Sequence, residues 1–508
     1  MIDHASLLPL YAAGGTPLLV LIAELATGKR AAAAGSLLLG GLATIVCALV
    51  GSRTATFCSA AGVCSWTPSP LAVTAAVVFA ALTLGVLALS MPGLRLGTAP
   101  PGEYCFLLAS SMAGGVVVGY AGDLITLIVG LETLTLPLYV LVGLRRFAPR
   151  ERVTTQGASA SVTFFLISII STAIALLGAA LNYAATGALH LDRLVAAIGP
   201  TAPVATVGVA LMVIGFAFKV AAVPLHAWAP PTYDGAPIPV AAYLSTASKL
   251  GGVLALVAIV SRLDAGSVTA VLAVLTMTIG NLVALTQTRM VRLLAWSSIA
   301  QAGYILAPLA LGAYGVRAAL AYAVFFVVLE FIAFGVLAAL RAPGADGGTI
   351  DAYRGAGRRS PWLGAAMVLA VAGLAGLPPG LAGLFAKVTI VDALINRGWG
   401  WLAGVVALNA VIALAYYVRV AAVLYSTTPS TGPAPADPAA ADPAAARPAR
   451  ARATATDLAP AVDDPALLEA ATSPRQPVSR PVAVALIAAA AVAVVLGFAP
   501  QLLFSSLT

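Results

Sequence analysis

The sequence predicts an all-α polytopic membrane protein of about fourteen transmembrane helices, with two inverted five-helix repeats and two broken helices. Its 508 residues are 61% hydrophobic and only 9% charged, whereas about a quarter of the residues in a soluble domain are charged. Apolar runs long enough to cross a bilayer, which takes about 20 residues, recur along the chain. These runs are continuous rather than alternating, which excludes a transmembrane β-barrel.

The expected helices follow one another in order and are joined mostly by short loops. They span 7–27, 31–51, 70–90, 103–120, 122–143, 158–181, 203–223, 236–261, 267–286, 293–312, 316–340, 361–395, 401–425 and 481–504. With the N-terminus outside, thirteen Lys and Arg residues fall in inside loops and five in outside loops. The positive-inside rule therefore predicts that both termini lie outside.

Two of these segments are interrupted by proline beside a lysine. Pro224 follows Lys219, and Pro378-Pro379 precede Lys387. Proline removes a helical hydrogen bond, and irregular backbone at membrane depth needs a protein interior or a wet cavity. Each break falls in the fourth helix of a set of five, and an odd number of helices inverts the second set, as in many transporters.

This pattern divides the chain into five parts. They are an N-terminal three-helix segment (1–102), a first repeat (103–262), a second repeat (263–425), an Ala/Pro-rich loop (426–480) and a C-terminal helix (481–508). The composition of the loop predicts disorder, and the topology places it in the cytoplasm. The first residues lack the basic region of a cleavable signal peptide.

Ionisable residues inside apolar runs are the candidate functional groups. Three of the four lysines, Lys219, Lys249 and Lys387, lie in such runs, as does Glu132. A charge in hydrocarbon costs at least about 2.5–3.5 kcal/mol and is tolerated where it faces protein or water. We expect Glu132 to pair with Lys219 and switch as a proton arrives. The alternative is a structural acid bonded to Thr133 or Thr135.

Four further residues are weaker candidates. Ser245 and Ser248 precede Lys249 and could order water for a proton relay, while His226 is either a titrating group or a structural donor. Lys387 is either the outermost relay group or a snorkelling lysine. Glu330 is a further buried acid whose partner the sequence does not identify.

The remaining motifs set limits on the chemistry. Cys58 and Cys64 share one outside loop, where a disulfide is allowed. No metal-ligand spacing, phosphate loop, dinucleotide fingerprint, iron–sulfur cysteine cluster or haem histidine pair is present. We therefore expect no metal or cofactor in this chain, no nucleic-acid partner, and redox chemistry only in other chains.

Several blocks resemble the antiporter-like membrane subunits of proton-pumping NADH:quinone oxidoreductase, respiratory complex I. They are GLETLTLPLYVLVGLRR around Glu132, PLHAWAPPTYDGAPIPVAAYLSTASK after Lys219, RLLAWSSIAQAGY at 292–304 and GLPPGLAGLFAK at 376–387. The string from Tyr233 to Val240 is similar to the subunit N type, the counterpart of mitochondrial subunit 2. The resemblance spans about residues 103–425.

This resemblance implies a row of buried charges at mid-membrane that moves protons while other subunits, carrying FMN, iron–sulfur clusters and quinone, reduce the quinone. Glu132, Lys219, Lys249 and Lys387 match the row. The chain departs from the family pattern at Thr163, where a lysine is common, at Gln301, where a histidine is usual, and at Glu330, where an asparagine is usual.

The predicted function is thus a proton-translocating membrane subunit of complex I in a bacterial-type plasma membrane, with the lipid bilayer and other subunits as partners. One alternative is a subunit of a multi-subunit cation/proton antiporter, which would share the same helices and lysines. The other is a structural paralogue of subunit N that moves no protons, an alternative that Thr163 and Gln301 keep open.

Overall fold

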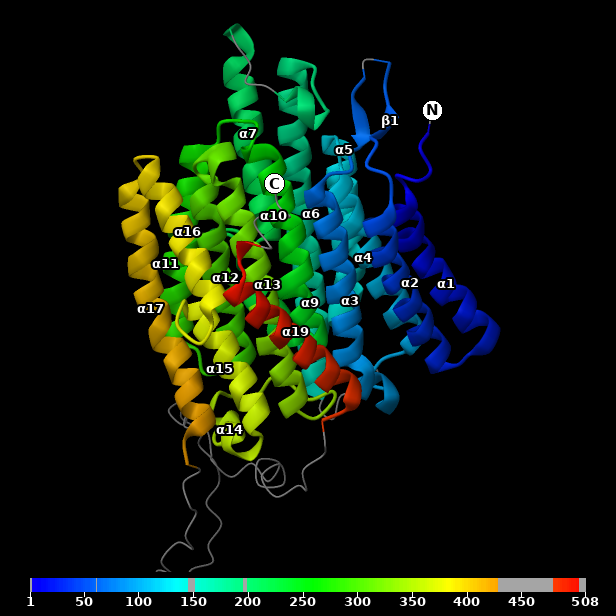
Figure 1. The fold of residues 1–508 in the computed structure, drawn as a ribbon, viewed down its shortest axis with the longest axis vertical. Coiled ribbons are helices and arrows are strands. Elements are labelled where there is room, and N and C mark those ends of the chain that lie inside the picture. Colours follow the sequence, from blue (N-terminus) through cyan, green and yellow to red (C-terminus); the bar gives the residue numbers. More distant parts are fainter. Residues whose placement is uncertain (1, 61, 145–150, 195–198, 428–477, 502–508) are drawn as a thin grey trace, which may run out of the picture.

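A computed structural model describes residues 2–60, 62–144, 151–194, 199–427 and 478–501 as a bundle of long, roughly parallel helices (Figure 1). The helices are α1 (Leu8–Thr27), α2 (Arg30–Val50), α3 (Pro70–Leu96), α4 (Pro101–Tyr120), α5 (Leu124–Gly143), α6 (Glu151–Thr186), α7 (Ala202–Lys219), α8 (Ala229–Gly235), α9 (Ile238–Tyr243), α10 (Lys249–Val260), α11 (Gly266–Thr286), α12 (Met290–Leu309), α13 (Val316–Leu340), α14 (Ala356–Arg359), α15 (Pro361–Ala375), α16 (Leu381–Asn396), α17 (Gly400–Tyr425) and α19 (Arg480–Phe498).

The helical membrane fold predicted from the sequence is confirmed. Within the described ranges, twelve segments are long and apolar enough to cross a membrane. The predicted spans 293–312 and 361–395 fall outside that set: the first forms α12, and the second is divided into α15 and α16. The total of fourteen spans and the inverted repeats stay predictions.

Burial separates a central segment from peripheral helices. In an 18-residue window of the span Ile238–Val260, made of α9, a π-helical turn (Leu244–Ser248) and α10, 94% of the residues are buried. In the corresponding windows of α1 and α19 the share is 28% and 22%, and their outward faces carry large apolar side chains such as Ile22 and Ile487. The central span therefore packs against protein on all sides, while the outer helices present the apolar surface that lipid requires.

Both predicted helix breaks are present. Helix α7 ends at Lys219, and nine residues separate it from α8. Helix α15 ends at Ala375, the following Gly376 has a φ of +85° in the left-handed region that favours glycine, and α16 begins at Leu381. At this second break Gly383 packs so closely on the Gly373 backbone that a Cβ at Gly383 would collide with it.

The two ends of the bundle differ. The hairpin of β1 (Thr56–Cys58) and β2 (Cys64–Trp66) lies at the same end as the start of α1, whereas α14 and the end of α17 lie at the other (Figure 1). Helix α19 runs obliquely across the bundle and packs on α3, α13 and α16. The predicted disordered loop 426–480 falls almost entirely on residues 428–477, outside the described ranges.

Candidate functional site

Lys219, at the end of α7, has a complete set of hydrogen-bond acceptors. Its Nζ lies 2.7 Å from Glu132 Oε1 in α5, 3.1 Å from Thr135 Oγ1 and 3.0 Å from Ser168 Oγ in α6. An ammonium has three N–H donors, so protein oxygens match all of them. Lys219 is only 3% exposed. Three helices thus build a site for a protonated lysine, and the acid is the one that the sequence favoured as its partner.

Glu132 is less deeply buried than its position in the sequence suggested. Its side chain is 26% exposed, and on the same face of α5 Val129 and Leu136 are more than half exposed. Glu132 Oε1 also accepts a hydrogen bond from Thr172 Oγ1 in α6 at 2.6 Å. The pair therefore lies near the edge of this chain, with the lysine on the inner side.

The neighbouring hydroxyls in α5 do not bond the acid as the alternative interpretation supposed. Thr133 and Thr135 both donate to main-chain carbonyls one turn earlier in their own helix. Thr135 Oγ1 instead accepts from Lys219, and Thr172 supplies the hydroxyl for Glu132. The sequence carried no signal for Thr172, because its contact depends on how α6 packs on α5.

A close approach of α10 to α7 positions Lys219. A Cβ added to Gly252 would lie 2.8 Å from Lys219 Cβ and 3.0 Å from Val220 Cγ1. A separation below 3.0 Å is not tolerated without movement. The absence of a side chain at Gly252 therefore permits the backbone of α10 to lie directly against the break after Lys219.

Lys249, the first residue of α10, is bonded by α12. Its Nζ donates to the Ser298 main-chain oxygen at 2.6 Å and to Ser298 Oγ at 2.5 Å, and the residue is 1% exposed. Ser245, in the π-helical turn just before it, donates to the carbonyl of Ala242. The hydroxyl that contacts Lys249 is therefore that of Ser298, in the predicted block 292–304, and not that of Ser245.

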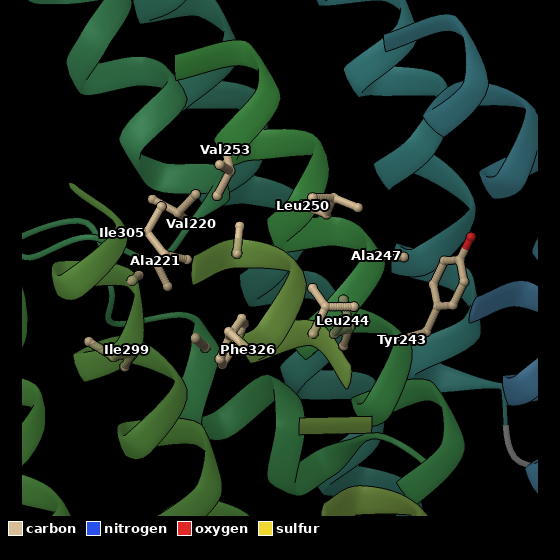
Figure 2. Packing of buried hydrophobic residues seen from close by; sticks show 14 of the residues in the cluster. Val220, Ala221, Tyr243, Leu244, Ala247, Leu250, Val253, Ile299, Ile305 and Phe326 are labelled. Atoms are coloured by element: carbon tan, nitrogen blue, oxygen red, sulfur yellow. The ribbon is translucent and has the colours of Figure 1, made fainter. Parts of the chain in front are cut away.

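Apolar side chains from four segments form part of the buried core beside the first turns of α10. Val220 and Ala221 follow α7, Leu250 and Val253 belong to α10, Ile299 and Ile305 to α12, and Phe326 to α13, as Figure 2 shows. The Lys249 ammonium lies 5.8 Å from the centre of the Phe326 ring.

Lys387, in α16, is held by the backbone of the second break. Its Nζ donates to the main-chain oxygens of Leu374 at 2.8 Å and Ala375 at 2.7 Å, at the end of α15. These carbonyls lack helical partners because α15 ends there. The ammonium also lies 4.9 Å from the Tyr304 ring centre. Lys387 is 7% exposed, so it points into the protein and does not snorkel.

Gln301 connects the surroundings of Lys387 to α12, α13 and α17. Its Nε2 donates to the same Leu374 oxygen at 3.1 Å and to Tyr417 Oη at 2.8 Å, while its Oε1 accepts from Tyr322. Tyr417 Oη is also 2.5 Å from Ser297 Oγ. The amide is fully buried, and both its nitrogen and its oxygen are hydrogen-bonded.

The other candidate residues are less fully bonded. Glu330 in α13 is 0% exposed, and within the described ranges neither carboxylate oxygen has a hydrogen-bond partner. His226 is partly exposed in the break after α7, and its ring centre lies 5.2 Å from that of Trp296. Ser248 is 1% exposed. Thr163 lies in α6 and is partly exposed, whereas Ser168, further along α6, contacts Lys219.

A charged cluster that the sequence analysis missed ties α8 to two loops. Arg289 bonds both carboxylate oxygens of Asp234, at 2.8 and 3.0 Å, and Asp346 at 3.2 Å; Arg341 bonds Asp346 at 3.1 Å. Burial alone would raise the pKa of Asp346, but the two arginines together hold it below its ordinary value. Asp234 belongs to the Tyr233–Val240 string, so that string also anchors the segment after the first break.

Cys58 and Cys64 are joined by a disulfide across the β1–β2 hairpin. Among the residues that the structure describes, no group of three or more His, Cys, Asp or Glu side chains could hold a metal ion.

Comparisons with known proteins identify the family. A family model described as NADH:quinone oxidoreductase/Mrp antiporter, TM, matches residues 121–413, which is more than half of the chain. The chain belongs to this family. Within the family it is 55% identical over 99% of its length to NADH-quinone oxidoreductase subunit N of Salinispora tropica, 98% of which is covered.

Further relatives place the chain in the same family. It is 42% identical over 84% of its length to NADH-quinone oxidoreductase subunit N 2 of Streptomyces griseus, 83% of which is covered. The fold is similar to a chain of respiratory complex I from Thermus thermophilus (TM-score 0.77, 24% identity, 98% and 99% of the two chains covered). It is equally similar to a chain of the Mrp complex from Dietzia (TM-score 0.77, 23% identity, 100% and 96% covered).

Proposed function

We propose that the chain is subunit N of a complex I-type NADH:quinone oxidoreductase and that it relays protons across the membrane. The observation that carries the proposal is the Lys219–Glu132 pair, in which a buried ammonium lies 2.7 Å from a carboxylate. An opposite charge at this distance favours the protonated lysine, and separation from it favours the neutral form. A change in that separation therefore moves a proton on or off Lys219.

Lys249 and Lys387 extend the relay. Each is nearly inaccessible and bonded by oxygens from a different helix, so each can hold a proton without an adjacent carboxylate within ion-pair distance among the described residues. Glu132 modulates Lys219, Lys249 receives the proton, and Lys387 passes it onward. His226, Glu330, Ser245 and Ser248 are further candidates, because all four lie near a break or near the lysines.

Other subunits supply the redox chemistry and cover exposed parts of this chain. FMN, iron–sulfur clusters and the quinone site are assigned to them. Pro224 and Ala227 in the first break, and Pro378 and Pro379 in the second, are exposed. Because irregular backbone at membrane depth must be covered by protein or line water, these exposed breaks support neighbouring protein at both positions.

In the membrane, we assign the N-terminus and C-terminus to the outside of a bacterial-type plasma membrane, with the loop 426–480 in the cytoplasm. The segment 1–102 precedes a first repeat at 103–262 and a second at 263–425, followed by the C-terminal part 481–508. Support comes from the loop charges and from the two breaks, which lie beside Lys219 and Lys387 in corresponding helices of the two sets.

Two alternatives make different predictions. In a multi-subunit cation/proton antiporter, a function that the fold similarity to the Mrp complex favours, the native chain would purify without redox subunits. In complex I it co-purifies with flavin and iron–sulfur subunits, and the intact complex reduces quinone with NADH.

The non-pumping alternative is tested with Lys249→Ala, with Lys29→Ala as the control. Lys29 is exposed at the start of α2. The proposal predicts that Lys249→Ala abolishes proton uptake by sealed vesicles while the complex still assembles, and that Lys29→Ala pumps as the native protein does. Unchanged pumping in Lys249→Ala would favour a structural paralogue.

A further inference from the structure

The carboxyl group of Glu330 is unusual in being fully buried and unbonded. It lies in the middle of α13, which packs against α10 and the π-helical turn before Lys249. Neither Oε1 nor Oε2 has a hydrogen-bond donor among the described residues. A buried carboxylate without donors is strongly unfavourable, so such a group is either neutral or compensated by a nearby positive charge.

Lys249 has the complementary deficit. An ammonium carries three N–H donors, and Ser298 receives two of them, at 2.6 and 2.5 Å. The Lys249 ammonium lies 5.8 Å from the centre of the Phe326 ring, and Glu330 follows Phe326 by one turn of α13. Lys249 and Glu330 do not form a direct ion pair within 4.0 Å, since the described ion pairs of buried lysines comprise only Lys219–Glu132. A free donor on Lys249 and two free acceptors on Glu330 thus lie in the same buried region without a direct hydrogen bond between them.

The other titratable groups near Glu330 are neutral phenols. Tyr233 of α8 and Tyr417 of α17 both interact with it electrostatically, and both are fully buried. Of the groups that interact with Glu330, Lys249 is therefore the one that carries a positive charge.

We propose that Glu330 is the counter-ion of Lys249 and that buried water bridges the two groups. A water molecule in such a site accepts from the third N–H of Lys249 and donates to Glu330, and the Tyr233 hydroxyl supplies a further polar contact. Buried waters typically make two to four hydrogen bonds to groups that would otherwise be unsatisfied, as these are. The water-bridged contact keeps both groups ionised in the resting protein.

This second pair differs from the first in geometry. Lys219 contacts Glu132 directly, whereas Lys249 and Glu330 are linked through water, and the acid comes from α13 rather than α5. The proposed pairing concerns only charge compensation in the resting protein. It does not depend on whether the chain pumps protons. Its test therefore relies on spectroscopy and stability, which can fail independently of the pumping assays above.

Infrared spectra of the assembled complex provide the first test, using Lys249→Met, Glu330→Gln and the double variant. Removing the cation leaves a buried acid that is favoured only in its neutral form. The proposal predicts that Lys249→Met gains the C=O stretching band of a protonated carboxylic acid, absent from the native complex, and that the double variant loses it again. A Lys249→Met spectrum without the new band, or a native band that Lys249→Met leaves unchanged, would overturn the proposal.

Thermal disassembly of the same complexes provides the second test. Each single variant is expected to lower the midpoint by about 3–5 °C, because an uncompensated group remains buried. The midpoint of the double variant is expected to fall by clearly less than the sum of the two single-variant decreases. If Lys249→Met alone does not assemble, the added Glu330→Gln must restore assembly. Additive losses, or a double variant that also fails to assemble, would contradict the pairing.

Glu24 provides the matched control. It is another carboxyl group in a membrane-spanning helix, but α1 packs against α2 and α4 and not against the helices that hold Lys249. Glu24→Gln should leave the infrared band of the Lys249→Met variant in place, and its effect on the midpoint should add to that of Lys249→Met. Removal of the band by Glu24→Gln would show that the band arises from a different acid and would refute the assignment to Glu330.

Discussion

Gly252→Ala perturbs Lys219 without changing any ionisable group. The new Cβ would lie 2.8 Å from Lys219 Cβ and 3.1 Å from the Lys219 carbonyl carbon, whereas ordinary contact begins at 3.4 Å. One of the two helices must therefore move by about 0.6 Å, and overpacking of this kind costs about 1–3 kcal/mol of stability. Because backbone atoms are involved on the α7 side, a change of side-chain rotamer alone cannot relieve the clash.

The displacement has a consequence for the ion pair. If the shift is carried through the lysine, the distance from Nζ to Glu132 Oε1 rises from 2.7 Å to about 3.3 Å, beyond the range of a good hydrogen bond. Gly251→Ala is the matched control, because its Cβ meets the movable end of the Leu134 side chain. We expect Gly252→Ala to lower both thermal stability and proton uptake per quinone reduced, and Gly251→Ala to lower pumping much less.

The assay compares the two variants in the assembled complex, with midpoints of thermal disassembly and proton uptake by sealed vesicles measured on the same preparations. Equal pumping by Gly252→Ala and Gly251→Ala would refute the argument that the contact between α10 and α7 positions Lys219. A loss of stability with native pumping would mean that the pair tolerates a displacement of this size.

Three further results are expected. Lys387→Met should stop proton uptake while quinone reduction continues, because the relay ends at Lys387; pumping equal to native would assign this lysine a structural role. Arg289 helps to hold the pKa of Asp346 below 3.8, so the stabilisation from their pairing should be constant at neutral pH and be lost as the pH falls below about 4. Asp346→Asn should accordingly lower the free energy of unfolding at pH 7 by about 0.5–1 kcal/mol. Below about pH 4 the variant and the native protein should become more nearly equal in stability. A stability difference that does not change with pH would contradict this pairing. A membrane-impermeant thiol reagent should label Cys58 and Cys64 from the outside only after reduction, and labelling from the inside would invert the assigned topology.

The helical membrane fold and the two breaks could be predicted from the sequence because each depends on local composition. A run of 20 apolar residues satisfies its backbone only as a helix, and paired prolines or a left-handed glycine such as Gly376 end it wherever they occur. The divided form of the predicted span 361–395 follows from the same local signals.

The contacts of the site could be predicted only in part. Glu132 and Lys219 were identified because charges in apolar segments are rare, but Ser168, Thr172 and Ser298 are ordinary hydroxyls that become partners through helix packing. The π-helical turn before Lys249 and the proximity of Glu330 to Lys249 likewise depend on the register of α10 against α13. Charge alone marked these residues as candidates, and tertiary structure decided which of them meet.

Proton uptake per quinone reduced, compared between native and Lys219→Ala complexes in sealed vesicles, tests the central claim most directly. If this chain is a working proton channel, quinone reduction persists or slows while uptake per quinone falls. Uptake per quinone equal to that of the native complex would contradict the account and leave the buried Lys219–Glu132 pair with a structural role.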